Sequence, residues 1–153
     1  MQTILVCDDD KEIVEAIQIY LEQEGYEVLT AYDGMQALQQ IRQNQIDLLV
    51  IDVMMPRLDG IHATMKIREE SKVPVIIISA KSEDADKILG LNIGADDYVT
   101  KPFNPLELVA RVKSQLRRYD MMSAQVPSGG ITYRLSWDFT LATSSSGLNG
   151  FVT

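Results

Sequence analysis

The sequence predicts an α/β protein in which helices cover both faces of a parallel β-sheet. Five short apolar runs alternate with segments whose apolar residues recur at helical spacing, which is the pattern of a doubly wound sheet. The runs are rich in Val, Ile and Leu and nearly continuous, as expected of strands buried on both faces. Polar groups directly follow four of these runs. Because ligands bind beyond the carboxyl ends of the strands in such sheets, one shared site is predicted there.

The expected strands in the first half of the chain are residues 4–7, Glu27–Ala31 and 48–51. A helix follows the first strand and ends at Gly25, and its apolar residues are Ile13, Ala16, Ile17, Tyr20 and Leu21. Asp33 and Gly34 turn the chain into a short second helix. Its apolar residues are Ala37, Leu38 and Ile41.

In the second half, a loop with Pro56 and Gly60 leads to a helix over about residues 61–70. A strand at 75–78, a helix over about 84–91 and a strand at 97–101 follow. A last helix is expected from Pro105 to about Arg118. Asn104 is its candidate cap, and Glu107 stands where a reciprocal capping acid belongs.

Size and charge restrict the function. The 153 residues allow one ordinary domain and a modest extension, and 22 acidic against 14 basic residues give a formal charge of -8. Such a surface repels nucleic acid phosphates, and Arg117 and Arg118 form too small a basic patch to override it. No apolar stretch approaches the roughly 20 residues of a membrane span, and no signal peptide is evident. The single Cys7 is expected to be a buried packing residue, and the protein to be cytoplasmic.

The domain is expected to cover residues 1–119, with a linker or tail at 120–153. Two linker-like stretches in the tail, 127–130 and 144–147, flank a segment with a period of two, whose apolar members are Ile131, Tyr133, Leu135, Trp137, Phe139 and Leu141. This segment predicts a half-buried strand or hairpin too short to bury a core of its own. We expect it to pair with another strand edge or to be poorly ordered.

Carboxylates dominate the predicted site. Asp8, Asp9 and Asp10 follow the first strand, Asp52 follows the third, and Ser79 and Lys101 end the fourth and fifth. At an effective dielectric constant near 20, two carboxylates about 4 Å apart repel by about 4 kcal/mol, and a hard divalent cation such as Mg²⁺ relieves this repulsion. Helix capping is the plainer explanation for the triplet alone. The convergence with Asp52 and Lys101 favours a cation site.

Five segments together resemble the receiver domain of bacterial two-component response regulators. They are residues 4–10, 52–60, 79–80, 94–98 and 101–103, and they occur in the family's order and spacing. The resemblance covers residues 1 to about 119. It implies a flavodoxin-like fold with strand order 2-1-3-4-5 and five helices, and the role of a regulator that catalyses its own phosphorylation and dephosphorylation rather than that of a conventional enzyme.

The resemblance also implies residue roles. Asp52 would accept a phosphoryl group from a sensor histidine kinase. Asp9, Asp52 and the Met54 carbonyl would bind Mg²⁺ directly, with Asp8 acting mainly through water. Ser79 and Lys101 would contact the phosphoryl group, and Ser79 and Tyr98 would form the switch. Lys101-Pro102 matches the family's cis peptide. The departures are Cys7 for an aliphatic residue, Asp10 for Glu and Ser79 for Thr, and none removes a required group.

Residues 87–118 resemble the winged-helix (OmpR/PhoB-type) transcriptional subfamily, which dimerises on activation through its fourth helix, fifth strand and fifth helix. The implied ion pairs across the dimer are Lys87–Glu107, Asp97–Arg111 and Asp96–Arg118, around an apolar patch of Ile88, Leu91 and Val109. The alternative is a solvated charged helix face. The winged helix itself is missing: residues 126–142 resemble at most its opening strands, and a truncated or artificial end is favoured. DNA binding is therefore expected only through the missing domain.

Two other classes of protein have related features. A Mg²⁺-dependent aspartyl phosphohydrolase would carry Asp-x-Asp after the first strand and a larger cap, for which the chain has no room. A stand-alone receiver that acts by protein docking or in a phosphorelay fits the length equally well. The charges at the implied dimer pairs favour the transcriptional subfamily.

Overall fold

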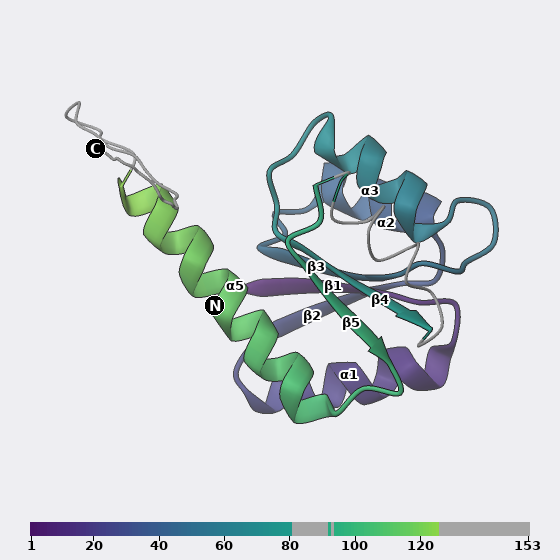
Figure 1. Cartoon of the computed structure of the whole chain (residues 1–153), viewed down its shortest axis with the longest axis horizontal. Helices are drawn as coiled ribbons and strands as arrows, with labels where there is room; N and C mark the ends of the chain where they lie inside the picture. Colours follow the sequence, from purple (N-terminus) through teal and green to yellow (C-terminus); the bar gives the residue numbers. More distant parts are fainter. Residues whose placement is uncertain (81–91, 93, 126–153) are drawn as a thin grey trace. The chain divides into compact units, whose positions relative to one another are not determined.

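The predicted parallel sheet is confirmed in a computed structural model, which describes residues 1–80, 92 and 94–125. The five strands are β1 (Thr3–Cys7), β2 (Glu27–Ala31), β3 (Leu48–Asp52), β4 (Val75–Ala80) and β5 (Asp97–Lys101). They are all parallel and lie in the order β2-β1-β3-β4-β5, as expected (Figure 1). The strand order reverses between β1 and β3, which is where ligands bind in sheets of this kind.

Four helices lie in the described part of the chain: α1 (Lys11–Gln23), α2 (Gly34–Gln43), α3 (Gly60–Arg68) and α5 (Pro105–Gln125). The helix expected over about 84–91 lies outside the described residues. The expectation that the last helix ends near Arg118 is wrong, since α5 continues to Gln125. No Gly or Pro interrupts residues 119–125, and Met, Ala and Gln favour the helix.

The sheet separates two apolar cores because neighbouring strand residues point to opposite faces. Ile4 and Val6 of β1 pack with α1 and the first turns of α5, whereas Leu5 and Cys7 pack with α2 and α3. All five residues of β3 are buried. Figure 1 shows α2 and α3 together over one face of the sheet. Burial on both faces fixes the strands in length and register, and this fixes where their carboxyl ends lie.

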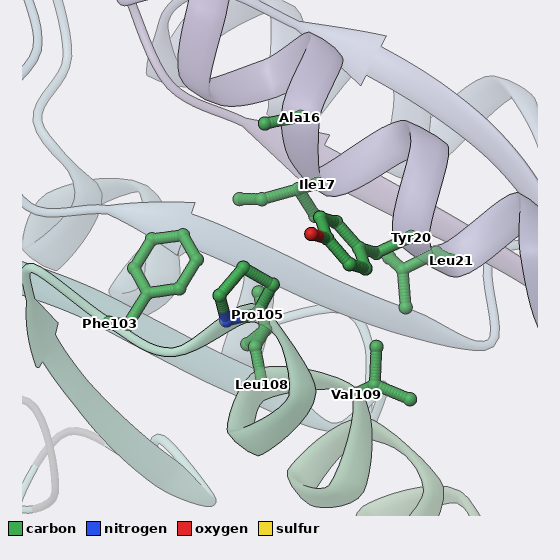
Figure 2. A pocket seen from close by; sticks show the side chains of 8 residues that line it. All are labelled: Ala16, Ile17, Tyr20, Leu21, Phe103, Pro105, Leu108 and Val109. Carbon is green, nitrogen blue, oxygen red and sulfur yellow. The ribbon is translucent and has the colours of Figure 1, made fainter.

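Val109 belongs to the core between α1 and α5 and not to an outer patch. It is 8% exposed and lies in the cluster that contains Ile17 and Leu21. With Tyr20 and Phe103 it lines a small apolar pocket, and Figure 2 shows its side chain facing α1. The helical spacing of Leu108, Val109, Val112 and Leu116 explains this placement. The expected interface loses this residue as an apolar contact.

The caps agree in part with the sequence analysis. The Asn104 side chain accepts a hydrogen bond from the Leu106 amide at 2.8 Å, as predicted for the start of α5. Glu107 does not act as expected at this end: it pairs with Arg111, one turn further along the helix, at 3.1 Å. The peptide bond between Lys101 and Pro102 is cis, as the resemblance implied.

The chain divides into two compact units, Met1–Leu116 and Arg117–Thr153. The first contains the whole sheet. Only residues 117–125 of the second are described, as the end of α5, so the alternating segment at 131–141 and the tail interpretations lie outside the described residues. Of the helices that the structure describes, none has the length and hydropathy of a membrane span.

Gly60 begins α3 directly against the last residue of β3. An ideal Cβ at this position would lie 2.1 Å from the carbonyl oxygen of Asp52 and 3.1 Å from the Cα of Val53. These atoms are backbone and cannot rotate away. The Gly60 amide donates to the Val53 carbonyl oxygen at 2.9 Å, so the turn that follows Asp52 is closed tightly.

We predict that Gly60→Ala lowers the free energy of unfolding by about 1–3 kcal/mol, because the added methyl group forces the β3 backbone to shift. Urea unfolding of the full chain measures this. Gly25→Ala is the control: its Cβ would meet no atom within 4 Å, and only its φ of 91° opposes the side chain. A Gly60→Ala protein as stable as the wild type would contradict the close packing.

Candidate functional site

The predicted site residues do meet at one edge of the sheet. In the strand register, Cys7 lies beside Ile51, Asp52 beside Ile78 and Ala80 beside Lys101. Asp8 and Asp9 therefore follow β1 at the level where β3 ends in Asp52. Asp8 and Asp52 are almost completely buried, at 1% and 4% exposure, whereas Asp9 is exposed.

Three of the four predicted acids form a cluster, and the fourth caps a helix. Oxygen atoms of Asp8, Asp9 and Asp52 lie within 4.8 Å of one another. Asp10 instead accepts hydrogen bonds from the amides of Glu12 and Ile13, at 3.0 and 3.4 Å, and caps α1. The capping interpretation is therefore confirmed for Asp10, and the metal interpretation stays a prediction for Asp8, Asp9 and Asp52.

Lys101 joins the two buried acids. Its Nζ atom lies 2.9 Å from Asp52 Oδ1 and 3.1 Å from Asp8 Oδ2. The side chain comes from β5, two strands away from β3 in the sheet. Three carboxylates against one ammonium leave two negative charges when all are ionised (3 − 1 = 2). A divalent cation with oxygen ligands matches this excess in charge and in ligand type.

Burial makes the acids hard to ionise. It raises the pKa of the Asp52 carboxyl from 3.8 to about 6. The hydrogen bond from Lys101 lowers this pKa, and the negative charge of Asp8 raises it further. Burial likewise raises the pKa of Asp8, although the Asp10 amide and Lys101 oppose it by hydrogen bonding. For Lys101, burial lowers the pKa, but the hydrogen bonds to Asp52 and Asp8 outweigh this and raise it overall. Lys101 therefore carries a positive charge across the physiological range.

Ser79 has a hydroxyl group that lacks a partner. It is 1% exposed, and within the described ranges its Oγ is the buried side-chain oxygen or nitrogen atom for which no hydrogen bond is found. A buried polar group without a partner costs about 1–3 kcal/mol. Such an atom at the end of β4, one residue beyond the level of Asp52, is well suited to bind an oxygen of an incoming group. Tyr98, the second expected switch residue, is 8% exposed and packs on the α2 and α3 side of the sheet.

The side chains of the remaining predicted residues are not part of this cluster. Met54 is in the loop after β3, with its side chain 68% exposed. Asp97 pairs with Arg111 within the chain at 2.6 Å, and Asp96 pairs with Arg68 at 2.8 Å. Arg118 is exposed and belongs to the second unit. Three expected interface residues fall outside the described part of the chain: Lys87, Ile88 and Leu91.

Sequence reasoning missed the partners of Asp33. The residue was expected only to turn the chain into α2, yet its carboxylate is 8% exposed and lies 3.4 Å from the guanidinium of Arg57. Its main-chain carbonyl accepts a hydrogen bond from the Cys7 thiol at 3.2 Å. Cys7 itself is buried, as expected. The one available signal was an acidic residue preceding Gly34, which is too common to indicate an ion pair.

We predict a specific pH dependence of stability without metal. The folded protein holds a proton on Asp52 up to a pKa of about 6, whereas the unfolded chain releases it near 3.8. The contribution of Asp52 to stability therefore falls as pH rises from about 4 to 6. Since one pKa unit corresponds to about 1.4 kcal/mol, Asp52→Asn removes a penalty of about 2–3 kcal/mol at neutral pH.

Urea unfolding in EDTA across this pH range measures the effect. The stability gained by Asp52→Asn should grow with pH and level off above the pKa of Asp52. Asp47→Asn serves as the control for the loss of one charge. Asp47 accepts a hydrogen bond from the amide of Thr3, the first residue of β1, so it lies at the opposite end of the sheet from Asp52. A gain that is independent of pH would contradict the raised pKa.

The chain is similar in sequence to known proteins. Residues 4–113 match the Response regulator receiver domain family. The chain is 56% identical over 117 residues to Response regulator GtcR of Aneurinibacillus migulanus, covering 76% of this chain and 48% of that protein. It is 48% identical over 120 residues to Regulatory protein VanR of Enterococcus faecium, covering 78% of this chain and 52% of that protein. The chain thus spans about half the length of these curated relatives.

A solved structure agrees in fold. The receiver domain of the Francisella response regulator 1452 is 43% identical, with a TM-score of 0.74, and the match covers 78% of this chain and 99% of that domain. Family match, identity and fold all extend over the part of the chain that contains the acid cluster and Lys101. The chain belongs to the response regulator receiver domain family of two-component systems.

Proposed function

We propose that Asp52 accepts a phosphoryl group from the phosphohistidine of a sensor kinase, with Mg²⁺ at the acid cluster, and that phosphorylation promotes dimerisation. The observation that carries this proposal is the bridge from Lys101 to both Asp52 and Asp8. It places a permanent positive charge beside a buried carboxylate at the open end of the sheet. A purely structural lysine would not need two buried acids around it.

The transfer itself needs little from the protein besides position and charge. An oxygen of Asp52 forms a bond to phosphorus while the P–N bond to the histidine ring breaks, and the electron pair of that bond moves to the ring nitrogen. Charge spreads over the oxygens of the transferred group. Lys101 neutralises part of this negative charge. The Ser79 hydroxyl, for which no partner is found among the described residues, donates a hydrogen bond to one of these oxygens.

The residues present fit Mg²⁺. Asp9 and Asp52 would bind it directly with the carbonyl of Met54, and Asp8 would act mainly through water. When bound, the cation screens the repulsion among the carboxylates and the phosphoryl oxygens. The donor set consists of oxygen atoms, and the cluster carries more negative charge than Lys101 balances. These proposed roles are the ones that the resemblance implies.

We predict that acetyl phosphate with Mg²⁺ adds one phosphoryl mass to the wild-type chain and none to Asp52→Asn. The reason is that Asp52 is the buried acid next to Lys101. Intact mass spectrometry measures the adduct. Asp59→Asn is a matched control, since Asp59 caps α3 by accepting a hydrogen bond from the His62 amide, which asparagine can also accept. Labelling of Asp52→Asn, or labelling that persists in EDTA, would show that the acceptor or the metal requirement is misassigned.

For the output, we propose a symmetric dimer of the winged-helix transcriptional type. The curated relatives are named as a response regulator and a regulatory protein, and the matched part makes up about half of their length. DNA binding would then belong to a further domain. Ser79 and Tyr98 are proposed to link the site to this face, because they lie on the neighbouring strands β4 and β5.

The charged residues of the proposed face are already paired within one chain. Arg111 lies between Asp97, at 2.6 Å, and Glu107, at 3.1 Å. Asp96 accepts hydrogen bonds from Arg68 and from the Val75 amide, both at 2.8 Å. In a dimer these groups would be shared across the two-fold axis rather than newly paired. Exposed ion pairs contribute about 0.2–1 kcal/mol each, so they select the partner and register more than they hold it.

We predict that phosphorylated or beryllofluoride-treated wild type sediments as a dimer and that Arg111→Glu stays monomeric. The reversal places a negative charge beside Asp97 and Glu107 in both copies. Arg111→Glu combined with Asp97→Arg should recover part of the association. Arg42→Glu, which reverses an exposed charge on α2, is the control. An undiminished dimer of Arg111→Glu would rule out this face.

A receiver that acts by docking alone is the remaining candidate. It shares the phosphorylation chemistry and differs only in the absence of a DNA-binding partner domain. The sedimentation experiment separates the two, because a docking receiver has no reason to dimerise on phosphorylation.

A further inference from the structure

The loop at residues 53–59, between β3 and α3, is held at its base and at its tip. At the base, the Gly60 amide donates to the Val53 carbonyl oxygen at 2.9 Å. At the tip, the Gly34 amide at the start of α2 donates to the Leu58 carbonyl oxygen at 3.0 Å. An ideal Cβ on Gly34 would lie 2.2 Å from that oxygen, so α2 and the loop touch backbone to backbone.

Arg57 gives this loop an unusual conformation. Its φ is 69°, and among the described residues it is the non-glycine residue with a positive φ. L-amino acids with side chains like arginine rarely adopt this region, so neighbouring groups must hold it. The neighbour is Asp33, whose Oδ2 lies 3.4 Å from Arg57 Nη1.

Asp33 is itself fixed in place. Its Oδ1 accepts a hydrogen bond from the Gln36 amide at 2.8 Å, and its main-chain carbonyl accepts from the Cys7 thiol at 3.2 Å. The Cys7 sulfur also lies 3.5 Å from Met55 Sδ. These contacts connect the end of β1, the start of α2 and the loop after β3. They begin at Cys7, the residue before Asp8.

We propose that Arg57 is a positioning residue for the cation site: its ion pair with Asp33 holds the loop that carries Met54 in the arrangement that binds Mg²⁺. This inference rests on the proposed function, which assigns Met54 and the acid cluster to Mg²⁺. Arg57 acts through the loop and does not contact the cation. Only Met55 and Pro56 separate Arg57 from Met54 in the chain, so a change in the backbone at Arg57 can reach Met54 directly.

Charge alone predicts the opposite effect, which makes the inference testable. Removing a positive side chain near an acidic cluster makes the cluster more negative and should tighten Mg²⁺ binding. Loss of positioning should weaken it. Arg57→Gln keeps an unbranched polar side chain and removes the positive charge, and with it the ion pair to Asp33. Its effect on Mg²⁺ affinity therefore has opposite signs under the two explanations.

The experiment is titration of the full chain with MgCl₂ by isothermal calorimetry at fixed ionic strength and neutral pH. We expect Arg57→Gln to raise the Kd about two- to fivefold, below the usual effect of residues that contact metal ligands directly. Arg57→Lys should stay close to wild type. Lys113→Gln is the control, because it removes a cation that pairs with Glu24 at the end of α1, on the α1 and α5 side of the sheet.

Arg57→Gly separates positioning from general stability. Glycine adopts a positive φ without strain, so thermal unfolding in EDTA should occur at or above the wild-type midpoint. Mg²⁺ binding should nevertheless weaken, because the ion pair is gone. A residue with only a structural role would change both in the same direction.

Equal or tighter binding by Arg57→Gln, or Arg57→Lys as weak as Arg57→Gln, would overturn the inference while leaving the proposed function intact. A wild-type chain without measurable Mg²⁺ binding would instead contradict the proposed cation site, and the inference with it.

Discussion

Much of this structure depends on a single contact: the ammonium group of Lys101 between the buried carboxylates of Asp52 and Asp8. Two acids at 4% exposure or less would repel each other and protonate without it. With it, one carboxylate can stay ionised in a buried position, yet its pKa remains raised. Lys101 thus offsets part of the repulsion between the buried acids. The three carboxylates still carry more negative charge than one lysine balances.

The sheet supplies the geometry for this contact. Lys101 ends β5, Asp52 ends β3 and Asp8 follows β1. The ends of these three strands must therefore lie at the same level of the sheet for the side chains to meet. Strands buried on both faces hold this agreement, because a shift by one residue would turn every side chain to the other face. The close approach of Gly60 to Asp52 extends the same precision into the loop after β3. The positions of the acids and of Lys101 at this edge therefore depend on how the strands pack.

The sequence predicted the sheet well because its signal is strong and local. Near-continuous apolar runs indicated the strands, and the acids at their ends indicated the site. Helix ends were less certain: nothing in residues 119–125 marks a stop, and α5 continues through them. Val109 was placed on a surface by resemblance, although its spacing from Leu108, Val112 and Leu116 indicates the core.

Other features had no sequence signal strong enough to predict them. Arginine does not indicate a positive φ, so the conformation of Arg57 and its pairing with Asp33 could be seen only in the structure. The sequence also did not show which of Asp8, Asp9 and Asp10 would cap the helix. Three adjacent acids are equivalent in the sequence, and only the turn into α1 directs Asp10 to the helix amides. Tertiary contacts between loops determined both.

The most direct test of this account is the titration of the Asp52 carboxyl carbon by ¹³C NMR, with and without saturating Mg²⁺. Without the cation, the midpoint should lie near the raised pKa of about 6. With it, the midpoint should fall well below the ordinary value for aspartate, since the cation favours the charged form. A midpoint near 3.8 that Mg²⁺ does not move would contradict the claim that Asp52 is a buried acid at a cation site.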